Sequence, residues 1–379
     1  MVQSPARRLL ALFASLTLSA CTTSTLIPDA SVDGSASDAA LRDGSAADAN
    51  LDAGPANPLC GCTSGLHASH IFLLGDDGEL YTYEPLTDTF EFRLGPVCAD
   101  TGRPFSMAVD PAGRAWIQES ESRRLARIDV NDLGACEDSG YLPTNPTFPL
   151  FGMSFVQQGA CASLYGLSYS GDGPFAEGPD LGEFGVVEGE PPRMRSLAAL
   201  DYDGGELAGT GDGRLFAFTG VDPAKIVELD PATGAVLEVV PLDGVSKTNA
   251  SAFAFFGGDI YLFTEAVPDA CEPCFESMCG EGWTACQADD ACESQVRCAI
   301  ETGTVSDACG GGAGEPMLSC MNACDTACFV RPAARVSQVL RIDWDESEGS
   351  GRQITQVRNE SPLRVVGAGT SPCVPTVPF

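Results

Sequence analysis

From residue 59 onward the chain alternates short apolar runs with turn residues. The runs are rich in Phe, Leu, Val and Tyr, and they end at Gly, Asp-Gly or Asp-Pro. Runs of about four to eight apolar residues bounded by turn formers are typical of β-strands. The pattern therefore predicts an all-β fold for this part of the chain.

The strand pattern repeats along the chain. KIVELDPATGAVLEVVPL from Lys225 and ELYTYEPLTDTFEFRLG from Glu79 both give a strand, a turn and a second strand, while LAGTGDGRLFAF and FAFFGGDIYLF give hairpins that begin such a unit. Four-stranded units at intervals of about 40 to 50 residues are typical of β-propeller blades. We expect such units to begin near the following residues: Phe105, Phe151, Glu206 and Ser251.

Strand counting predicts how the ring closes. The N-terminal unit, from His70 to Gly75 and onward, lacks a first strand, and LRVVGAGTSPC from Leu363 is a lone strand without partners. Placing the lone strand innermost in the first unit completes a five-bladed β-propeller and removes exposed sheet edges. The third unit is the weakest, with its third strand placed at about Leu181 to Val187. A β-sandwich is the alternative all-β arrangement.

A cysteine-rich segment, residues 271–328, interrupts the fifth unit between its second and third strands and divides the propeller into residues 59–270 and 329–379. A unit this small is usually held by disulfides, and a spacing of four residues between cysteines places them on one helix face. We therefore expect short helices stapled together. Zinc at Cys271-x-x-Cys274 is an alternative, although the segment holds no His. Its ten cysteines are Cys271, Cys274, Cys279, Cys286, Cys292, Cys298, Cys309, Cys320, Cys324 and Cys328.

The propeller carries six further cysteines. Cys98 and Cys136 flank the last strands of neighbouring units, so we expect them to pair. Cys373 is expected to join the C-terminal strand to Cys60 or Cys62, and Cys161 completes the set. An even number of cysteines remains once Cys21 is set aside, which suits an oxidising compartment.

The N-terminus has the features of a secretory signal. Arg7 and Arg8 precede an apolar run, and residues 18–21, LSAC, resemble a bacterial lipobox. This predicts a signal peptide over residues 1–20, lipidation of Cys21 and, because Thr22 follows, an outer-membrane or cell-surface location. An ordinary signal peptide with an incidental cysteine is the alternative. Residues 22–58 are acidic and free of aromatics, which predicts a disordered tether.

The formal net charge of -32 restricts the partners. Phosphate backbones require clustered Lys and Arg, so nucleic acid is excluded. The 58 residues of the cysteine-rich segment hold ten acids and one base, about twice the charge density of the propeller. We therefore expect a monomer that is held at the membrane by its lipid and binds a protein or glycan ligand that is cationic or bridged by divalent ions.

Few residues suggest catalysis. The nucleophile-elbow, zinc-protease and P-loop motifs are absent, and His67 and His70 are expected to have packing or surface roles. Asp110, Asp212 and Asp259 lie near the ends of predicted inner strands. They are weak candidates for a calcium site in the central channel. No cofactor is otherwise required.

The lipobox, the tether and the phrases AGTGDGRLFAF, FAFFGGDIYLF and VVGAGTSPC together resemble a group of uncharacterised secreted lipoproteins of myxobacterial type. The resemblance covers most of residues 70 to 373 and implies a propeller with a cysteine-rich insert. That group has no established activity, so the resemblance assigns no catalytic residue.

Three functions fit these observations. A non-enzymatic binding or scaffold lipoprotein is favoured by the tether, the insert and the lack of catalytic motifs. A calcium-dependent, lactonase-like hydrolase requires carboxylates gathered at the channel mouth. A quinoprotein-like dehydrogenase is disfavoured because Trp116, Trp283 and Trp344 follow no repeat period.

Overall fold

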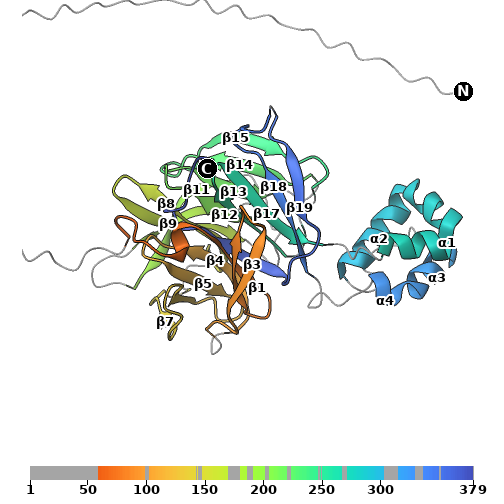
Figure 1. Ribbon diagram of the computed structural model, residues 1–379, viewed down its shortest axis with the longest axis horizontal. Helices are drawn as coiled ribbons and strands as arrows, with labels where there is room; N and C mark the ends of the chain where they lie inside the picture. Colours follow the sequence, from red (N-terminus) through yellow and green to blue (C-terminus); the bar gives the residue numbers. More distant parts are fainter. Residues whose placement is uncertain are drawn as a thin grey trace, which may run out of the picture. The chain divides into compact units, whose positions relative to one another are not determined.

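The folded part of the chain is a ring of five antiparallel four-stranded sheets with a helical insert (Figure 1). In this computed structural model each inner strand contacts the inner strand of the next blade, and β16 against β20 closes the ring. The five-bladed propeller expected from the sequence is therefore confirmed. The structure describes residues 59–98, 102–141, 143, 147–169, 180–185, 191–200, 205–219, 223–245, 248, 250–266, 271–302, 315–328, 336–349 and 351–378. The predicted signal peptide, Cys21, the tether and Cys309 lie outside these residues.

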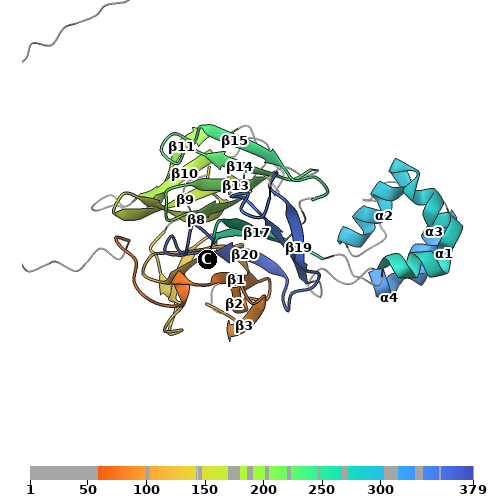
Figure 2. The same cartoon turned by 45° about the horizontal axis from the view of Figure 1, so that its top comes forward.

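Blade 1 takes its inner strand from the C-terminal end of the chain. Its order is β20-β1-β2-β3, and the four strands lie side by side in Figure 2. Leu73 pairs with Ala368, which fixes the register of the closing strand. The predicted closure is thus confirmed. The bounds are β20 (Val365–Gly369), β1 (Ile71–Gly75), β2 (Leu80–Glu84) and β3 (Thr89–Leu94), with a short 3-10 helix η1 (Leu66–Ala68) before β1.

Blades 2 to 5 each run from the innermost to the outermost strand in chain order. The third strand of blade 3 lies where the sequence placed it. Blades 2 and 3 contain β4 (Pro104–Val109), β5 (Arg114–Glu119), β6 (Leu125–Asp129), β7 (Glu137–Asp138), β8 (Leu150–Gln158), β9 (Cys161–Tyr169), β10 (Asp180–Gly185) and β11 (Arg193–Ala199). Blades 4 and 5 contain β12 (Glu206–Gly209), β13 (Leu215–Thr219), β14 (Lys225–Leu229), β15 (Val236–Pro241), β16 (Ser251–Phe256), β17 (Asp259–Glu265), β18 (Ser337–Ile342) and β19 (Ile354–Arg358).

The core of the ring consists of five apolar clusters, each between two neighbouring blades. In β1, Ile71 and Leu73 pack toward blade 5, whereas Phe72 and Leu74 pack toward blade 2. Alternate side chains of a strand point to opposite faces, and here both faces are buried. This is why such strands are continuous apolar runs in the sequence rather than alternating ones.

The described residues of the insert form four helices between β17 and β18. They are α1 (Cys271–Gln287), α2 (Asp290–Thr302), α3 (Glu315–Ala323) and α4 (Asp325–Cys328). Their buried side chains, among them Phe275, Val296 and Met321, form a cluster of their own. Within the described residues, no helix is long and apolar enough to cross a membrane.

Candidate functional site

The three candidate aspartates all follow an inner strand. Asp110 lies between β4 and β5, Asp212 between β12 and β13, and Asp259 begins β17. Because strands alternate in direction, the turns between first and second strands share one face of the ring. We call this the turn face. The connections between second and third strands, including the insert, leave from the opposite ends of the strands.

The carboxylate of Asp110 is fully engaged in its own turn. It is completely buried and accepts hydrogen bonds from the backbone amides of Ala112 at 3.0 Å and Arg114 at 2.9 Å. The Arg114 guanidinium at 2.8 Å and Trp116 Nε1 at 3.1 Å bind its other oxygen. Asp212 accepts a hydrogen bond from the Thr210 hydroxyl. Both aspartates therefore stabilise turns.

Asp259 belongs to a group of carboxylates. One oxygen each of Asp259, Asp343 and Asp345 lies within 4.8 Å of the others, and this is the one such trio among the residues that the structure describes. Burial raises the pKa of Asp259 to about 6, Arg341 opposes the rise, and the two neighbouring aspartates add to it. Oxygen ligands at this spacing suit a hard cation such as calcium.

The loop after β18 fixes the other two carboxylates of the trio. The buried Asp343 accepts the backbone amides of Ser347 at 2.9 Å and Glu348 at 3.0 Å, and Asp345 accepts the Ser347 amide at 3.0 Å. Sequence reasoning selected Asp259 but missed its two partners. The Asp343-x-Asp345 spacing was a usable signal, because residues two apart that follow the same strand lie close together in a turn.

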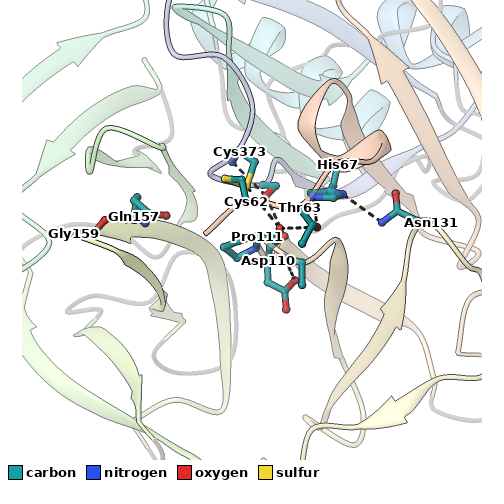
Figure 3. Close-up of a disulfide and its surroundings, with 11 residues drawn as sticks. Cys62, Thr63, His67, Asp110, Pro111, Asn131, Gln157, Gly159 and Cys373 are labelled. Atoms are coloured by element: carbon teal, nitrogen blue, oxygen red, sulfur yellow. Dashed lines mark hydrogen bonds between the residues drawn. A yellow bond between two sulfur atoms is a disulfide. The ribbon is translucent and has the colours of Figure 1, made fainter. Parts of the chain in front are cut away.

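Two chain segments fasten the turn face, residues 59–63 and residues 370–378, which together we call the clasp (Figure 3). Disulfides join Cys60 to Cys161 and Cys62 to Cys373. The Cys60 pairing was not specified by the sequence. The pairing of Cys373 with Cys62 was one of the two alternatives left open, and the Cys98–Cys136 disulfide agrees with its expectation.

Hydrogen bonds tie the clasp to blades 2, 3 and 5. Gly61 N donates to Ala160 O of blade 3 at 3.2 Å, and Thr63 N donates to Pro111 O of blade 2 at 3.2 Å. Ser371 Oγ donates to Asp110 O at 3.0 Å, and Gly257 N of blade 5 donates to Pro375 O at 2.8 Å. The clasp thus holds together blades that are far apart in the sequence.

His67 packs beneath the clasp. Its ring is completely buried, with Nε2 at 3.2 Å from Thr63 Oγ1 and Nδ1 at 3.3 Å from Asn131 Nδ2 (Figure 3). His70 Nδ1 lies 2.9 Å from Ser69 Oγ. Both imidazoles are engaged in local structure, in line with the packing and surface roles expected from the sequence.

At the opposite ends of the inner strands, buried polar side chains bind one another across blades. Ser106 Oγ of blade 2 donates to Glu206 Oε2 of blade 4 at 2.8 Å and accepts Met153 N of blade 3 at 3.3 Å. Burial, with the Glu206 charge as a lesser cause, raises the pKa of Tyr169 well above its ordinary value. This network joins three blades near the axis, where Ser106 is completely buried and Glu206 is nearly so.

The insert is closed by a ladder of disulfides between α1 and α3–α4. The nested pairs are Cys271–Cys328, Cys274–Cys324 and Cys279–Cys320, and Cys286–Cys292 ties α1 to α2. Cys298 is also disulfide-bonded. Cys271 and Cys274 are therefore disulfide cysteines in this structure, whereas the sequence had left zinc as an alternative. Cys320, Cys324 and Cys328 share one side of the helices, as their spacing predicted.

The blade does not depend on the insert for its strand pairing. β17 and β18 pair without a break up to Glu265 and Ser337, and Ala266 N donates to Val336 O at 2.9 Å just beyond them. On the insert side, Cys271 and Cys328 are joined covalently. The insert is therefore a self-contained module whose two ends are joined to each other, and the β-hairpin that it interrupts is complete without it.

Comparison with known proteins gives similarity to solved structures alone. No family model matches the chain, and no curated protein matches it. Virginiamycin B lyase from Staphylococcus aureus is similar at 11% identity and a TM-score of 0.29, covering 52% of this chain and 67% of that one. A PQQ-bound aldose sugar dehydrogenase from Streptomyces coelicolor is similar at 13% identity and a TM-score of 0.36. The match covers 71% of this chain and 85% of that one. The chain spans 61% of a streptogramin B lyase that it also matches, at 14% identity and a TM-score of 0.31. Likenesses this distant assign no activity.

Proposed function

We propose that this protein is an extracytoplasmic binding protein, anchored by a lipid on Cys21, whose insert presents an acidic surface to a cationic partner. The observation that carries the proposal is the self-contained insert, whose ends are joined by a disulfide and which interrupts a β-hairpin that is complete without it. A module with its own core contributes little to the blade that carries it. Its role therefore lies in what it presents to other molecules.

Charge supports the chemistry of the partner. The insert holds ten acids and one base, and Glu276 and Glu281 on α1 are exposed beside Met278, which is 61% exposed. A rigid, disulfide-bonded acidic surface loses little conformational entropy on binding and attracts cations over about a Debye length. A basic protein segment is the class of ligand that fits it.

The proposal is tested by removing the insert. Residues 267–335 are replaced by a Gly-Ser-Gly turn, and binding of poly-lysine is measured by calorimetry in low and physiological salt. We expect the intact protein to bind with a strong salt dependence and the shortened protein, folded by its β-sheet circular dichroism, to bind at least tenfold more weakly. A protein lacking residues 22–58 controls for the loss of bulk charge. Equal binding by the intact and shortened proteins would refute the assignment.

The anchorage has its own test. The Cys21→Ser variant is expressed in a bacterial host with a lipoprotein pathway, and the cells are labelled with a palmitate analogue. The native protein is expected to carry label and to fractionate with the outer membrane, whereas the variant is expected in the soluble fraction. Label that persists in Cys21→Ser contradicts the lipid assignment.

The trio of Asp259, Asp343 and Asp345 favours a second candidate, a calcium-dependent propeller hydrolase. Calcium would bind the three carboxylates on the turn face and offset their mutual repulsion. Calorimetry of calcium binding to the native protein and to Asp345→Asn tests this, since Asp345 contributes a carboxylate that Asn cannot replace in charge. If neither protein shows a heat of calcium binding, the calcium-dependent hydrolase is ruled out. If calcium binds, hydrolysis of lactones is measured next.

A further inference from the structure

The clasp joins the beginning and the end of the folded propeller covalently. Cys62 and Cys373 are 311 residues apart in sequence, and Cys60 and Cys161 are 101 apart. Both bridges lie on the turn face, at the point where residues 59–63 enter the fold. Any load carried by the preceding residues therefore reaches these two disulfides first.

Blade 1 would be the weak point without these bridges. The chain continues from the clasp through η1 into β1, which is held in its sheet by hydrogen bonds to β20 and β2. Its partner β20 comes from the other end of the chain. No short backbone connection therefore links β1 to β20, and hydrogen bonds hold the two strands together. Tension applied ahead of residue 60 would act on β1 before any other strand.

We propose that the clasp is a covalent strap that diverts tension from the N-terminal segment into blade 3 and the C-terminal tail, so that blade 1 is not pulled apart. One disulfide leads to Cys161 at the start of β9, and the other leads to Cys373 beyond β20. The proposal rests on the anchorage proposed above, since a tethered protein is loaded through its N-terminal side.

Non-covalent contacts spread the load further. The tail beyond β20 is buried at Thr370 and Ser371, and its bonds to Asp110 O and from Gly257 N reach blades 2 and 5. On the N-terminal side, Thr63 binds Pro111 O through both its amide and its hydroxyl group. Tension on either side of the clasp is therefore shared by several blades rather than by one strand pair.

Single-molecule pulling tests the strap. Handles are attached to the two ends of the chain from residue 22 to residue 379, and the oxidised protein is stretched in optical tweezers. The covalent path from Cys62 to Cys373 bypasses the propeller, so we expect no unfolding step from the native protein. In the double variant Cys62→Ser with Cys373→Ser, the force passes through the Cys60–Cys161 bridge and then along the chain from Cys161 to Cys373, which is roughly 212 residues. The Cys271–Cys328 bridge shields 57 of these residues, so about 155 residues can extend. At about 3.3–3.6 Å per residue these release roughly 500–560 Å.

A matched pair of variants controls for loss of any disulfide. Cys98→Ser with Cys136→Ser removes a bridge of 38 residues within the ring and is expected to behave as the native protein does. Melting curves establish that each variant is folded before it is pulled. A native protein that extends by several hundred ångström, or a clasp variant that does not extend, overturns the proposal. The pulling experiment contains no membrane and no cationic ligand, so its result does not depend on the proposed anchorage or binding. Failure of those proposals is detected separately, by the Cys21→Ser and insert-removal experiments.

Discussion

Asp259 shows how burial and neighbouring charge combine at a single residue. Its carboxyl lies between strand ends with Asp343 and Asp345 nearby, and Arg341, at 3.8 Å, offsets part of the charge. With the folded pKa at about 6 against 3.8 for the free side chain, the folded state holds this proton more tightly than the unfolded chain does. The contribution of Asp259 to stability is therefore favourable in acid and is lost as the pH rises from about 4 to 6.

We predict that Asp259→Asn is more stable than the native protein at pH 7.5 without divalent cations. The two-unit pKa shift corresponds to a gain of at most about 3 kcal/mol in the free energy of unfolding, because the ionised carboxylate is removed. The difference should vanish below about pH 4. Urea unfolding between pH 4 and 8 measures it, with the exposed Glu91→Gln as control. A variant that is less stable throughout this range would contradict the assignment.

Arg364 binds two carboxylates, those of the buried Glu265 and the half-buried Asp76. Its guanidinium binds Glu265 at 2.7 Å and Asp76 at 3.1 Å, joining the closing segment before β20 to blades 5 and 1. Burial raises the pKa of Asp76 although the hydrogen bond to Arg364 lowers it. The pair of acids is therefore costly to keep ionised in this place without the cation.

Replacing Arg364 by Met is predicted to destabilise the protein by about 3–5 kcal/mol at pH 7, since it leaves both carboxylates without this cation. Lowering the pH should reduce the loss, because burial raises the pKa of Asp76 and its protonation removes one of the charges. Arg195→Met is the matched control: its ion pair with Glu183 is largely exposed and is worth at most about 1 kcal/mol. Denaturant unfolding measures the free energy of unfolding of both variants. Equal losses would show that the ion pairs of Arg364 stabilise the protein no more than the exposed pair does.

At the scale of elements, the strands were predictable because their determinants are local. Asp-Pro and Asp-Gly turns separate runs that are apolar on both faces, so the blades begin at Pro104, Leu150, Glu206 and Ser251, at or next to the expected residues. The pairing within the insert was not predictable. Its nested ladder depends on how α1 and α3 pack, which the spacing of cysteines alone does not determine. For a similar reason the sequence identified only Asp259 of the three carboxylates, since Asp259 and Asp343 meet only when β17 and β18 pair.

The inner strands are glycine-rich because they approach one another closely. At Gly209 on β12 a Cβ atom would collide with the carbonyl oxygen of Phe155 on β8, and the Gly209 amide donates to Ser154 Oγ at 2.8 Å. Close packing near the axis therefore leaves no room for a side chain at this position.

We predict that Gly209→Ala lowers the free energy of unfolding by about 1–3 kcal/mol, because two inner strands must separate to admit the methyl group. Gly185→Ala on β10 is a suitable control, since its Cβ would meet nothing within 4 Å. Both are measured by thermal or denaturant unfolding. Similar stabilities for the two variants would mean that the ring accommodates the methyl group by relaxing.

At the scale of the whole molecule, the net charge of -32 opposes the compact state. Like charges on one body repel over about a Debye length, which salt shortens from roughly 30 Å at 0.01 M to about 8 Å at 0.15 M. We predict that the melting temperature rises between 0.01 and 0.15 M NaCl. The protein with residues 267–335 replaced lacks eight excess negative charges, since that range holds eleven acids and three bases, and it should show a smaller rise. A melting temperature that falls with salt would indicate that attractive ion pairs, such as Arg358 with Asp88, outweigh the repulsion.

The position of β20 in blade 1 also bears on how the molecule is made. A ribosome releases β1 almost 300 residues before it releases Val365–Gly369. Until then the inner edge of β1 has no partner, and unpaired edges recruit strands from other chains. Blade 1 of the nascent chain therefore lacks its inner strand throughout the synthesis of blades 2 to 5. Protection of that edge during synthesis is a requirement that this topology imposes on the cell.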